Sequence, residues 1–248
     1  MSSIQIEEYP HAVLLRLAKG ITSPINLALV NDLAAAVADI KQHHQGVVIA
    51  GGDKFFSIGL DIPTMIKTSP EEFSEFWNAF NQLLFDIYTL PMPTICAMRG
   101  NTIAGGAVLA LTCDYRYGAD NGKKMGLNEI KLGVPIPYLT SLTLPRLASD
   151  HAVREIIYGG EFFSFDIAHR DGLVDSIYPA AEVEARALEK VSSVAQRPKS
   201  AFQTMKATHI EAVVEAYLKN HKTKNAILAD MMFAEPARSK MIAAAENF

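Results

Sequence analysis

Cysteine is scarce in this chain, which contains only two among 248 residues. Two cysteines cannot supply the several disulfides that stabilise small secreted domains. Cys96 and Cys113 each lie within an apolar run, so we expect reduced side chains in the core. This usage of cysteine is typical of a protein from a reducing compartment.

The chain also lacks long apolar runs and a large excess of charge of one sign. No run approaches the roughly 18–20 apolar residues that span a membrane, and the N-terminal residues do not combine a basic start with an apolar core. The 23 basic and 27 acidic side chains give a net charge of −4, without a basic cluster that would bind nucleic acid. We therefore expect a cytoplasmic protein with neither a membrane nor a nucleic-acid partner.

The motifs of several enzyme classes are missing as well. The sequence has no G-x-S-x-G motif of α/β-hydrolases, no H-E-x-x-H zinc motif, no phosphate-binding P-loop and no G-x-G-x-x-G dinucleotide motif. The His43-His44 pair is interpreted as two solvated residues at a helix end. The sequence therefore predicts no metal site and no nucleotide or redox cofactor.

Hydrophobic periodicity indicates an α/β arrangement in the first part of the chain. Two β-rich segments, residues 4–7 and 12–17, predict an antiparallel hairpin. Continuous apolar strands are expected at residues 46–50, 94–98 and 173–178, with helical patterns between them. Strands that alternate with helices favour crossover units in which the strands are parallel.

From residue 180 onward the pattern is helical, with interruptions at Arg197-Pro198 and Glu235-Pro236. We expect an α/β domain over residues 1–178 that contains the active site, and an all-helical region over residues 179–248. The helical region carries more apolar side chains than three helices can bury alone. It should therefore pack on the core or on a neighbouring subunit.

Two glycine-containing turns each follow a predicted strand and precede a helical pattern. The first contains Gly59-Leu60-Asp61, and the second, about 45 residues later, contains Ala104-Gly105-Gly106. The N–H groups of a first helical turn lack partners within the helix. Each turn is therefore either a simple strand-to-helix connection, with Asp61 as the cap of the first helix, or a binding site for a negative oxygen.

Glu129 stands among apolar residues such as Leu127 and Ile130. It is either a catalytic base or a surface residue paired with Lys131, which on a strand would point to the same side. Apolar surroundings would raise the pKa of Glu129, and Lys131 would lower it. Two backbone donors and one carboxylate together suit a reaction through an enolate, in which a base removes a proton and the donors stabilise the new negative charge.

These segments are similar to the paired signature of the crotonase superfamily of enoyl-CoA hydratases and isomerases. Residues 55–61 resemble its F-S-x-G-x-D segment, and residues 101–114 resemble its glycine turn, apolar helix and Cys-Asp pair. Similar flanks at residues 24–28, 172–175 and 197–206 extend the resemblance over nearly the whole chain. It implies a crotonase-like α/β spiral of ββα units, a helical C-terminal region that builds homotrimers or hexamers, and an acyl-CoA substrate.

The resemblance also implies roles for individual residues. The backbone N–H groups of Leu60 and Gly105 would bind the thioester oxygen, and Glu129 would carry the proton. Coenzyme A would enter as part of the substrate, without a separate cofactor or metal. The residues expected to bind substrate lie around the two turns: Phe56, Ser57, Ile58, Gly59, Asp61, Met65, Ala104, Gly106 and Val108.

The reaction depends on how many acids the site contains. Hydratases of the superfamily use two glutamates, and the position of the first is occupied here by Val108. The resemblance therefore implies a Δ3,Δ2-enoyl-CoA isomerase, as in fatty acid β-oxidation, in which Glu129 alone moves a proton from C2 to C4. Two alternatives remain: a hydratase or related acyl-CoA enzyme whose second acid is Asp61, Asp86 or Tyr138, and a non-catalytic acyl-CoA-binding scaffold.

The sequence leaves the acyl and nucleotide positions open. We expect the coenzyme A nucleotide near residues 54–56. One predicted helix carries side chains that either pack in the core or border an acyl tunnel: Phe76, Trp77, Phe80, Leu83 and Leu84.

Overall fold

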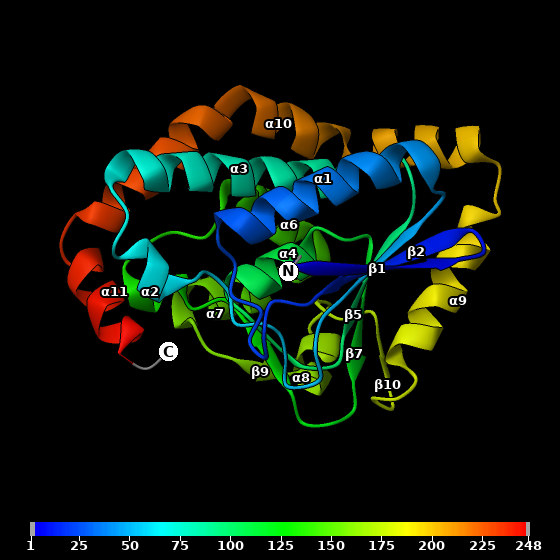
Figure 1. Cartoon of the computed structure of the whole chain (residues 1–248), viewed down its shortest axis with the longest axis horizontal. Helices are drawn as coiled ribbons and strands as arrows, with labels where there is room; N and C mark the ends of the chain where they lie inside the picture. The colour runs from blue at the N-terminus through cyan, green and yellow to red at the C-terminus, as the bar shows by residue number, and fades with distance from the viewer. Residues whose placement is uncertain (1–2, 247–248) are drawn as a thin grey trace.

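The strands form two sheets in a computed structural model that describes residues 3–246 (Figure 1). The larger sheet has the order β1-β2-β3-β5-β7-β10. Its hairpin β1–β2 is antiparallel, as predicted, and its other neighbouring strands are parallel. The strands are β1 (Ile4–Tyr9), β2 (Ala12–Leu17), β3 (Val47–Ala50), β5 (Thr94–Met98), β7 (Tyr115–Ala119) and β10 (Ser176–Tyr178).

The smaller sheet lies beside the larger one and has the order β4-β6-β8-β9. Its strands are β4 (Phe55–Ser57), β6 (Asn101–Ile103), β8 (Lys124–Gly126) and β9 (Phe163–Ser164). The chain passes from β3 to β4, from β5 to β6 and from β7 to β8, so three successive strands of the larger sheet are each followed by a strand of the smaller sheet. This repeat confirms the predicted spiral of strand pairs and helices.

Several helices of the α/β part begin at side-chain caps. The Asn26 side chain accepts from the Leu29 N–H at the start of α1. Ser69 and Glu72 form a reciprocal capping box, with Pro70 as the first residue of α3. The helices are α1 (Leu27–His43), α2 (Ile62–Met65), α3 (Pro70–Tyr88), α4 (Gly105–Leu111), α5 (Glu129–Leu132), α6 (Tyr138–Leu147), α7 (Asp150–Gly159) and α8 (Phe165–Arg170).

The C-terminal region is helical as predicted and consists of α9 (Val183–Ala195), α10 (Lys199–Phe233) and α11 (Ala237–Ala245), while residues 247–248 lie outside the described residues. Helix α9 buries Val183, Ala187 and Val191 against one face of the larger sheet. Helix α10 lies along α3 and α6, and α11 turns back beside α2 and α5 (Figure 1). The region therefore packs on the α/β core, whereas its role in assembly stays a prediction.

Buried cations attach distant segments to the start of β7. Arg116, only 2% exposed, donates to the carbonyls of Leu173 and Cys113 and pairs with Asp175 at 2.8 Å. Lys206 of α10 pairs with Asp114 at 2.9 Å and donates to the Met92 carbonyl. Because an unpaired buried charge is strongly destabilising, these pairs fix where the late strand and α10 dock.

The structure adds detail to the elements expected from the sequence. Strand β10 starts at Ser176, later than predicted, because the N–H groups of Leu173 and Val174 donate to the Ala168 carbonyl. The Ser149 side chain caps α7 by accepting from the Ala152 N–H. Cys96 and Cys113 are free and buried, as predicted. Among the described residues, no helix combines the length and apolar character needed to cross a membrane.

Candidate active site

The two glycine turns meet because β4 and β6, the strands that precede them, are parallel neighbours. Gly59 has a φ of +94°, and a Cβ there would lie 3.0 Å from the Gly105 nitrogen and 3.0 Å from the Ala104 Cβ. Only glycine adopts this conformation readily and leaves room for that approach. Ala104 itself has a φ of 46°, an uncommon value for a residue with a side chain. The two turns thus form one structure, as the family resemblance implied.

The backbone N–H groups of Leu60 and Gly105 are available to a ligand. The residues on either side of Leu60 bond to Ile25. The Gly59 carbonyl accepts from the Ile25 N–H, and the Asp61 N–H donates to the Ile25 carbonyl. The Leu60 N–H therefore points to the other side. Gly105 is the first residue of α4, where an N–H has no intrahelical partner. Within residues 3–246 neither N–H donates a hydrogen bond, and both residues line the same cavity.

Glu129 begins the four-residue helix α5, which ends at Gly133 in the left-handed conformation. The segment is a helical turn and not the strand on which Lys131 would point to the same side, so the reading that pairs Glu129 with Lys131 is wrong. The helical turn directs Lys131 elsewhere, and its Nζ lies 2.6 Å from the Glu161 carboxylate. Glu129 instead lines the cavity, and its Oε2 is buried without a hydrogen-bond partner among the described residues.

The surroundings of Glu129 favour the neutral carboxyl. Burial raises its pKa to about 7, and the backbone N–H groups of Glu129 and Asn128 oppose this change only in part. No charged neighbour contributes to the shift. Near neutral pH the carboxyl is therefore divided between its two forms, so that it can both accept and release a proton.

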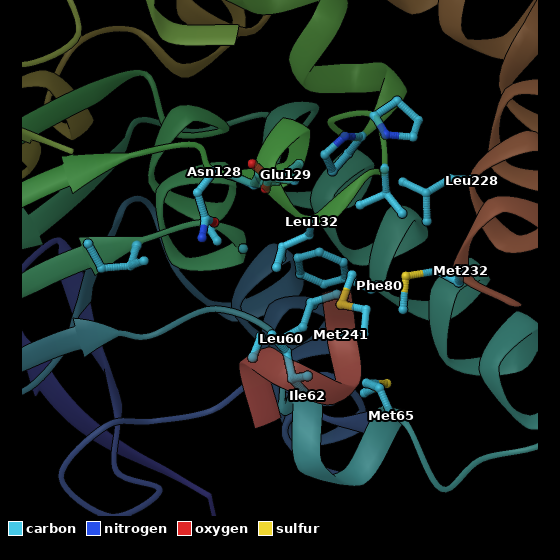
Figure 2. Close-up of a pocket in the computed structure, with 18 of the residues that line it drawn as sticks. Leu60, Ile62, Met65, Phe80, Asn128, Glu129, Leu132, Leu228, Met232 and Met241 are labelled. Carbon is cyan, nitrogen blue, oxygen red and sulfur yellow. The ribbon is translucent and has the colours of Figure 1, made fainter. Parts of the chain in front are cut away.

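The cavity has a volume of about 400 Å³ and a mostly apolar wall (Figure 2). Glu129 lies at one end with Asn128, and the C-terminal helices close another side (Figure 2). Among the described residues, Glu129 is the only acidic residue of the wall. The other lining residues are Ile58, Leu60, Ile62, Met65, Trp77, Phe80, Ile103, Ala104, Gly105, Val108, Leu132, Val134, Pro135, Pro137, Phe162, Leu228, Met232, Met241 and Ala244.

The residues that the sequence assigned to substrate binding fall into two groups. Those that line the cavity are Ile58, Met65, Ala104 and Val108, together with Leu60 and Gly105. The others lie behind its wall, and their contact with a substrate stays a prediction: Phe56, Ser57, Gly59, Asp61 and Gly106.

The residues behind the wall hold the turns in place. Phe56 is a fully buried core residue. The Ser57 hydroxyl donates to the Ser23 carbonyl and accepts from the Gly59 N–H. Gly106 packs so closely that an added Cβ would lie 2.7 Å from the Ser57 carbonyl oxygen. Asp61 caps α2, as one reading of the sequence expected.

No second acid reaches the cavity from the positions that the sequence suggested. The Asp61 carboxylate accepts from Asn26 and from the N–H of Thr64. Asp86 accepts from Gln82 on the outer side of α3, and the Tyr138 hydroxyl donates to the Ala216 carbonyl. Within the described residues, no three His, Cys, Asp or Glu side chains come together to hold a metal ion.

Several lining residues were not identified from the sequence. The wall receives Leu228 and Met232 from α10, and Met241 and Ala244 from α11. Helical periodicity predicted only that these residues are buried, because the pattern does not show which element or cavity the apolar face of a helix contacts. Trp77 and Phe80 line the cavity, whereas the other aromatic and leucine residues of α3 considered for an acyl tunnel are core residues: Phe76, Leu83 and Leu84.

A family model described as enoyl-CoA hydratase/isomerase matches residues 19–246. The chain belongs to the enoyl-CoA hydratase/isomerase family. Among curated relatives, human mitochondrial enoyl-CoA delta isomerase 1 is 34% identical over 153 residues, which are 61% of this chain and 51% of that protein. A crotonyl-CoA hydratase from Syntrophomonas wolfei is 32% identical over 169 residues, 68% of this chain and 63% of that protein. The chain thus spans little more than half the length of the curated relatives it matches.

Solved structures of the family share the fold. The crystal structure of human mitochondrial delta3-delta2-enoyl-CoA isomerase superimposes with a TM-score of 0.94 at 24% identity, covering 99% of this chain and 97% of that chain. The crystal structure of an enoyl-CoA hydratase from Bacillus halodurans superimposes with a TM-score of 0.89 at 19% identity, covering 98% of this chain and 100% of that chain. These likenesses confirm the crotonase fold that the sequence predicted.

The raised pKa of Glu129 predicts a pH-dependent loss of stability. The folded-state pKa of Glu129, about 7, exceeds its ordinary value of 4.5, because burial favours the protonated carboxyl. As pH rises from 4.5 to 7, the unfolded chain loses this proton more readily than the folded protein, so the folded state loses stability. Relative to Glu129→Gln, the free energy of unfolding of the wild-type protein should fall by about 2–3 kcal/mol over this range, at about 1.4 kcal/mol per pKa unit. Urea denaturation of both proteins measures the difference, and parallel pH curves would contradict it.

Proposed function

We propose that this protein is a Δ3,Δ2-enoyl-CoA isomerase that converts a 3-enoyl-CoA to the conjugated 2-enoyl-CoA. The observation that carries the proposal is the single carboxyl of Glu129, with a pKa near 7, in an apolar cavity that also presents the free N–H groups of Leu60 and Gly105. Enolate chemistry needs both a base for the acidic carbon and donors for the oxygen that becomes negative.

The proposed mechanism uses these groups in two proton transfers. The thioester oxygen accepts hydrogen bonds from Leu60 and Gly105, while the Glu129 carboxylate removes a proton from C2. The C2–H bonding electrons form the C1–C2 double bond, and the carbonyl π electrons move to the oxygen as the dienolate forms. The protonated Glu129 then delivers the same proton to C4, where the C3–C4 π electrons bond it. The C1–C2 π electrons become the C2–C3 double bond, and the oxygen electrons re-form the thioester carbonyl. Removal of one such oxyanion donor typically costs about 3–4 kcal/mol of transition-state stabilisation.

Among the residues that the structure describes, no second acid lines the cavity, and this favours isomerisation over hydration. Addition of water requires one group to orient and deprotonate the water and another to protonate the neighbouring carbon. Val108 faces the cavity with an aliphatic side chain, and the carboxylates of Asp61 and Asp86 lie outside the wall. A non-catalytic acyl-CoA-binding scaffold would have no use for a buried carboxyl that titrates near neutral pH.

The proposal extends to assembly and to the metabolic role. Several large apolar side chains of α10 are exposed, and a second copy of the chain would cover them: Met205, Leu218, Ile227 and Met231. A homotrimer or hexamer is the assembly that accords with the family resemblance. The reaction would allow β-oxidation of unsaturated acyl chains, with coenzyme A present only as part of the substrate.

Replacement of Glu129 tests the proton shuttle. The wild-type protein should convert a 3-enoyl-CoA to a conjugated thioester, followed by ultraviolet absorbance, and Glu129→Gln should lower kcat by about 10²–10⁴-fold because the general base is lost. Glu161→Gln, at an exposed glutamate paired with Lys131, is the matched control and should retain activity. Absence of conjugation by the wild-type protein would refute the isomerase, and an active Glu129→Gln would refute the base.

Substitution of Gly59 tests the oxyanion site, since a side-chain change at Leu60 leaves its N–H in place. An added Cβ would lie 3.0 Å from the Gly105 nitrogen, so Gly59→Ala should separate the two donors and lower kcat by about 10²–10³-fold. Gly122 also has a positive φ, of +71°, with nothing within 4 Å of an added Cβ. Gly122→Ala therefore carries similar backbone strain without the clash, and equal kinetics of the two variants would argue against the oxyanion pair.

A further inference from the structure

Asn128 occupies a position at which its side chain would ordinarily cap a helix. It is the residue before α5, and asparagine is among the residues preferred there because its side-chain oxygen accepts from the backbone. Asn128 makes no such bond, and its Oδ1 is buried without a partner among the described residues. Buried side-chain oxygens rarely lack a hydrogen-bond partner. This indicates that the Asn128 amide bonds to a group other than the backbone of α5.

The nearest unsatisfied group along the chain is the carboxyl of the next residue. Glu129 Oε2 is also buried without a partner among the described residues, and both side chains line the same cavity. The two lie together at one end of the pocket, away from Met65 and Met232 (Figure 2). Apart from the indole of Trp77, the remaining lining side chains of the described chain are apolar.

We propose that Asn128 is a positioning residue whose side-chain amide hydrogen-bonds the Glu129 carboxyl throughout the proton transfer. This inference rests on the proposed isomerase function. An amide has both a donor and an acceptor, so it can donate to the carboxylate before the proton is taken and accept from the carboxylic acid afterwards. A rotation of the Asn128 side chain by about 180° about its Cβ–Cγ bond exchanges the positions of the amide oxygen and the amide NH₂ group. A charged partner would stabilise only one of the two protonation states of Glu129. An apolar partner would form a hydrogen bond with neither state.

The other titratable groups near α5 do not perform this role. Lys131 pairs with Glu161, and Arg238 of α11 donates to the carbonyl of Ile66. The remaining charged groups on the elements packed against α5 are exposed: Asp150, His151, Arg154 and Glu155 of α7, and Lys240 of α11. Among the described residues of the cavity wall, Asn128 is therefore the one neutral group that can both donate to Glu129 and accept from it.

The test compares Asn128→Leu with two further variants. Asn128→Leu keeps the approximate size without the hydrogen bonds, and Asn128→Ser restores a group that donates and accepts. The matched control is Asn81→Leu, since Asn81 also has a buried, unpartnered Oδ1 but does not line the cavity. Kinetics with a 3-enoyl-CoA across pH give kcat and KM, and infrared difference titration against the Glu129→Gln form of each protein gives the pKa of Glu129 without substrate.

Asn128→Leu should lower kcat at pH 7 by about tenfold, leave KM within about twofold, and raise the midpoint of Glu129 by about one pH unit, because donation to the carboxylate is lost. Asn128→Ser should recover most of both effects, and Asn81→Leu should leave the midpoint unchanged. An unchanged midpoint in Asn128→Leu would overturn the proposal. So would a higher KM with unchanged kcat and midpoint, which would indicate a substrate contact instead.

The two measurements separate this inference from the function on which it rests. If the wild-type protein does not act on a 3-enoyl-CoA, the isomerase proposal fails by itself, and the infrared titration still decides whether Asn128 contacts Glu129. If Asn128→Leu does not fold, Asn128→Ala, which also lacks the amide and is smaller, provides the same comparison with Asn81→Leu.

Discussion

The close approach of two backbone segments, at Gly59 and Gly105, is the constraint on which the site depends. Parallel pairing of β4 and β6 brings the turns together, and the lack of a side chain on each glycine lets them touch. This contact places the Leu60 and Gly105 N–H groups beside one cavity. The donors belong to the main chain, so most side-chain changes leave them present, whereas any change in the pairing of the two strands displaces them.

The second requirement is a carboxyl that is neither charged at all times nor neutral at all times. Burial in the apolar wall raises the pKa of Glu129 to about 7, and no charged group among the described residues lowers it toward its ordinary value. The C-terminal helices contribute to this wall through Leu228, Met232 and Met241. The helical region is therefore part of the reaction environment, because without it the carboxyl would face water and titrate closer to its ordinary pKa.

The sequence predicted an α/β core, the two turns and a helical C-terminal region from local signals such as apolar strands and glycines, and its resemblance to the crotonase superfamily implied the spiral fold and the meeting of the turns. It failed where the answer depends on tertiary contacts. Residues 129–132 contain an alternating apolar pattern short enough for either a strand or one helical turn, and the turn that ends at Gly133 separates Glu129 from Lys131. The roles of Met241 and Asn128 could not be predicted either, since packing of α11 and the absence of a cap bond have no signature in the sequence.

The central claim is that one carboxyl carries one proton between two carbons, and the fate of an isotopic label tests it most directly. A 3-enoyl-CoA with deuterium at C2 would be isomerised in ordinary water, and the C4 position of the product analysed by nuclear magnetic resonance. In a cavity with a single acid, part of the deuterium should appear at C4, because Glu129 delivers the atom it removed before solvent replaces it. Hydrogen derived only from solvent at C4, even in the earliest product, would show that a different group protonates C4 and would contradict the single-carboxyl shuttle.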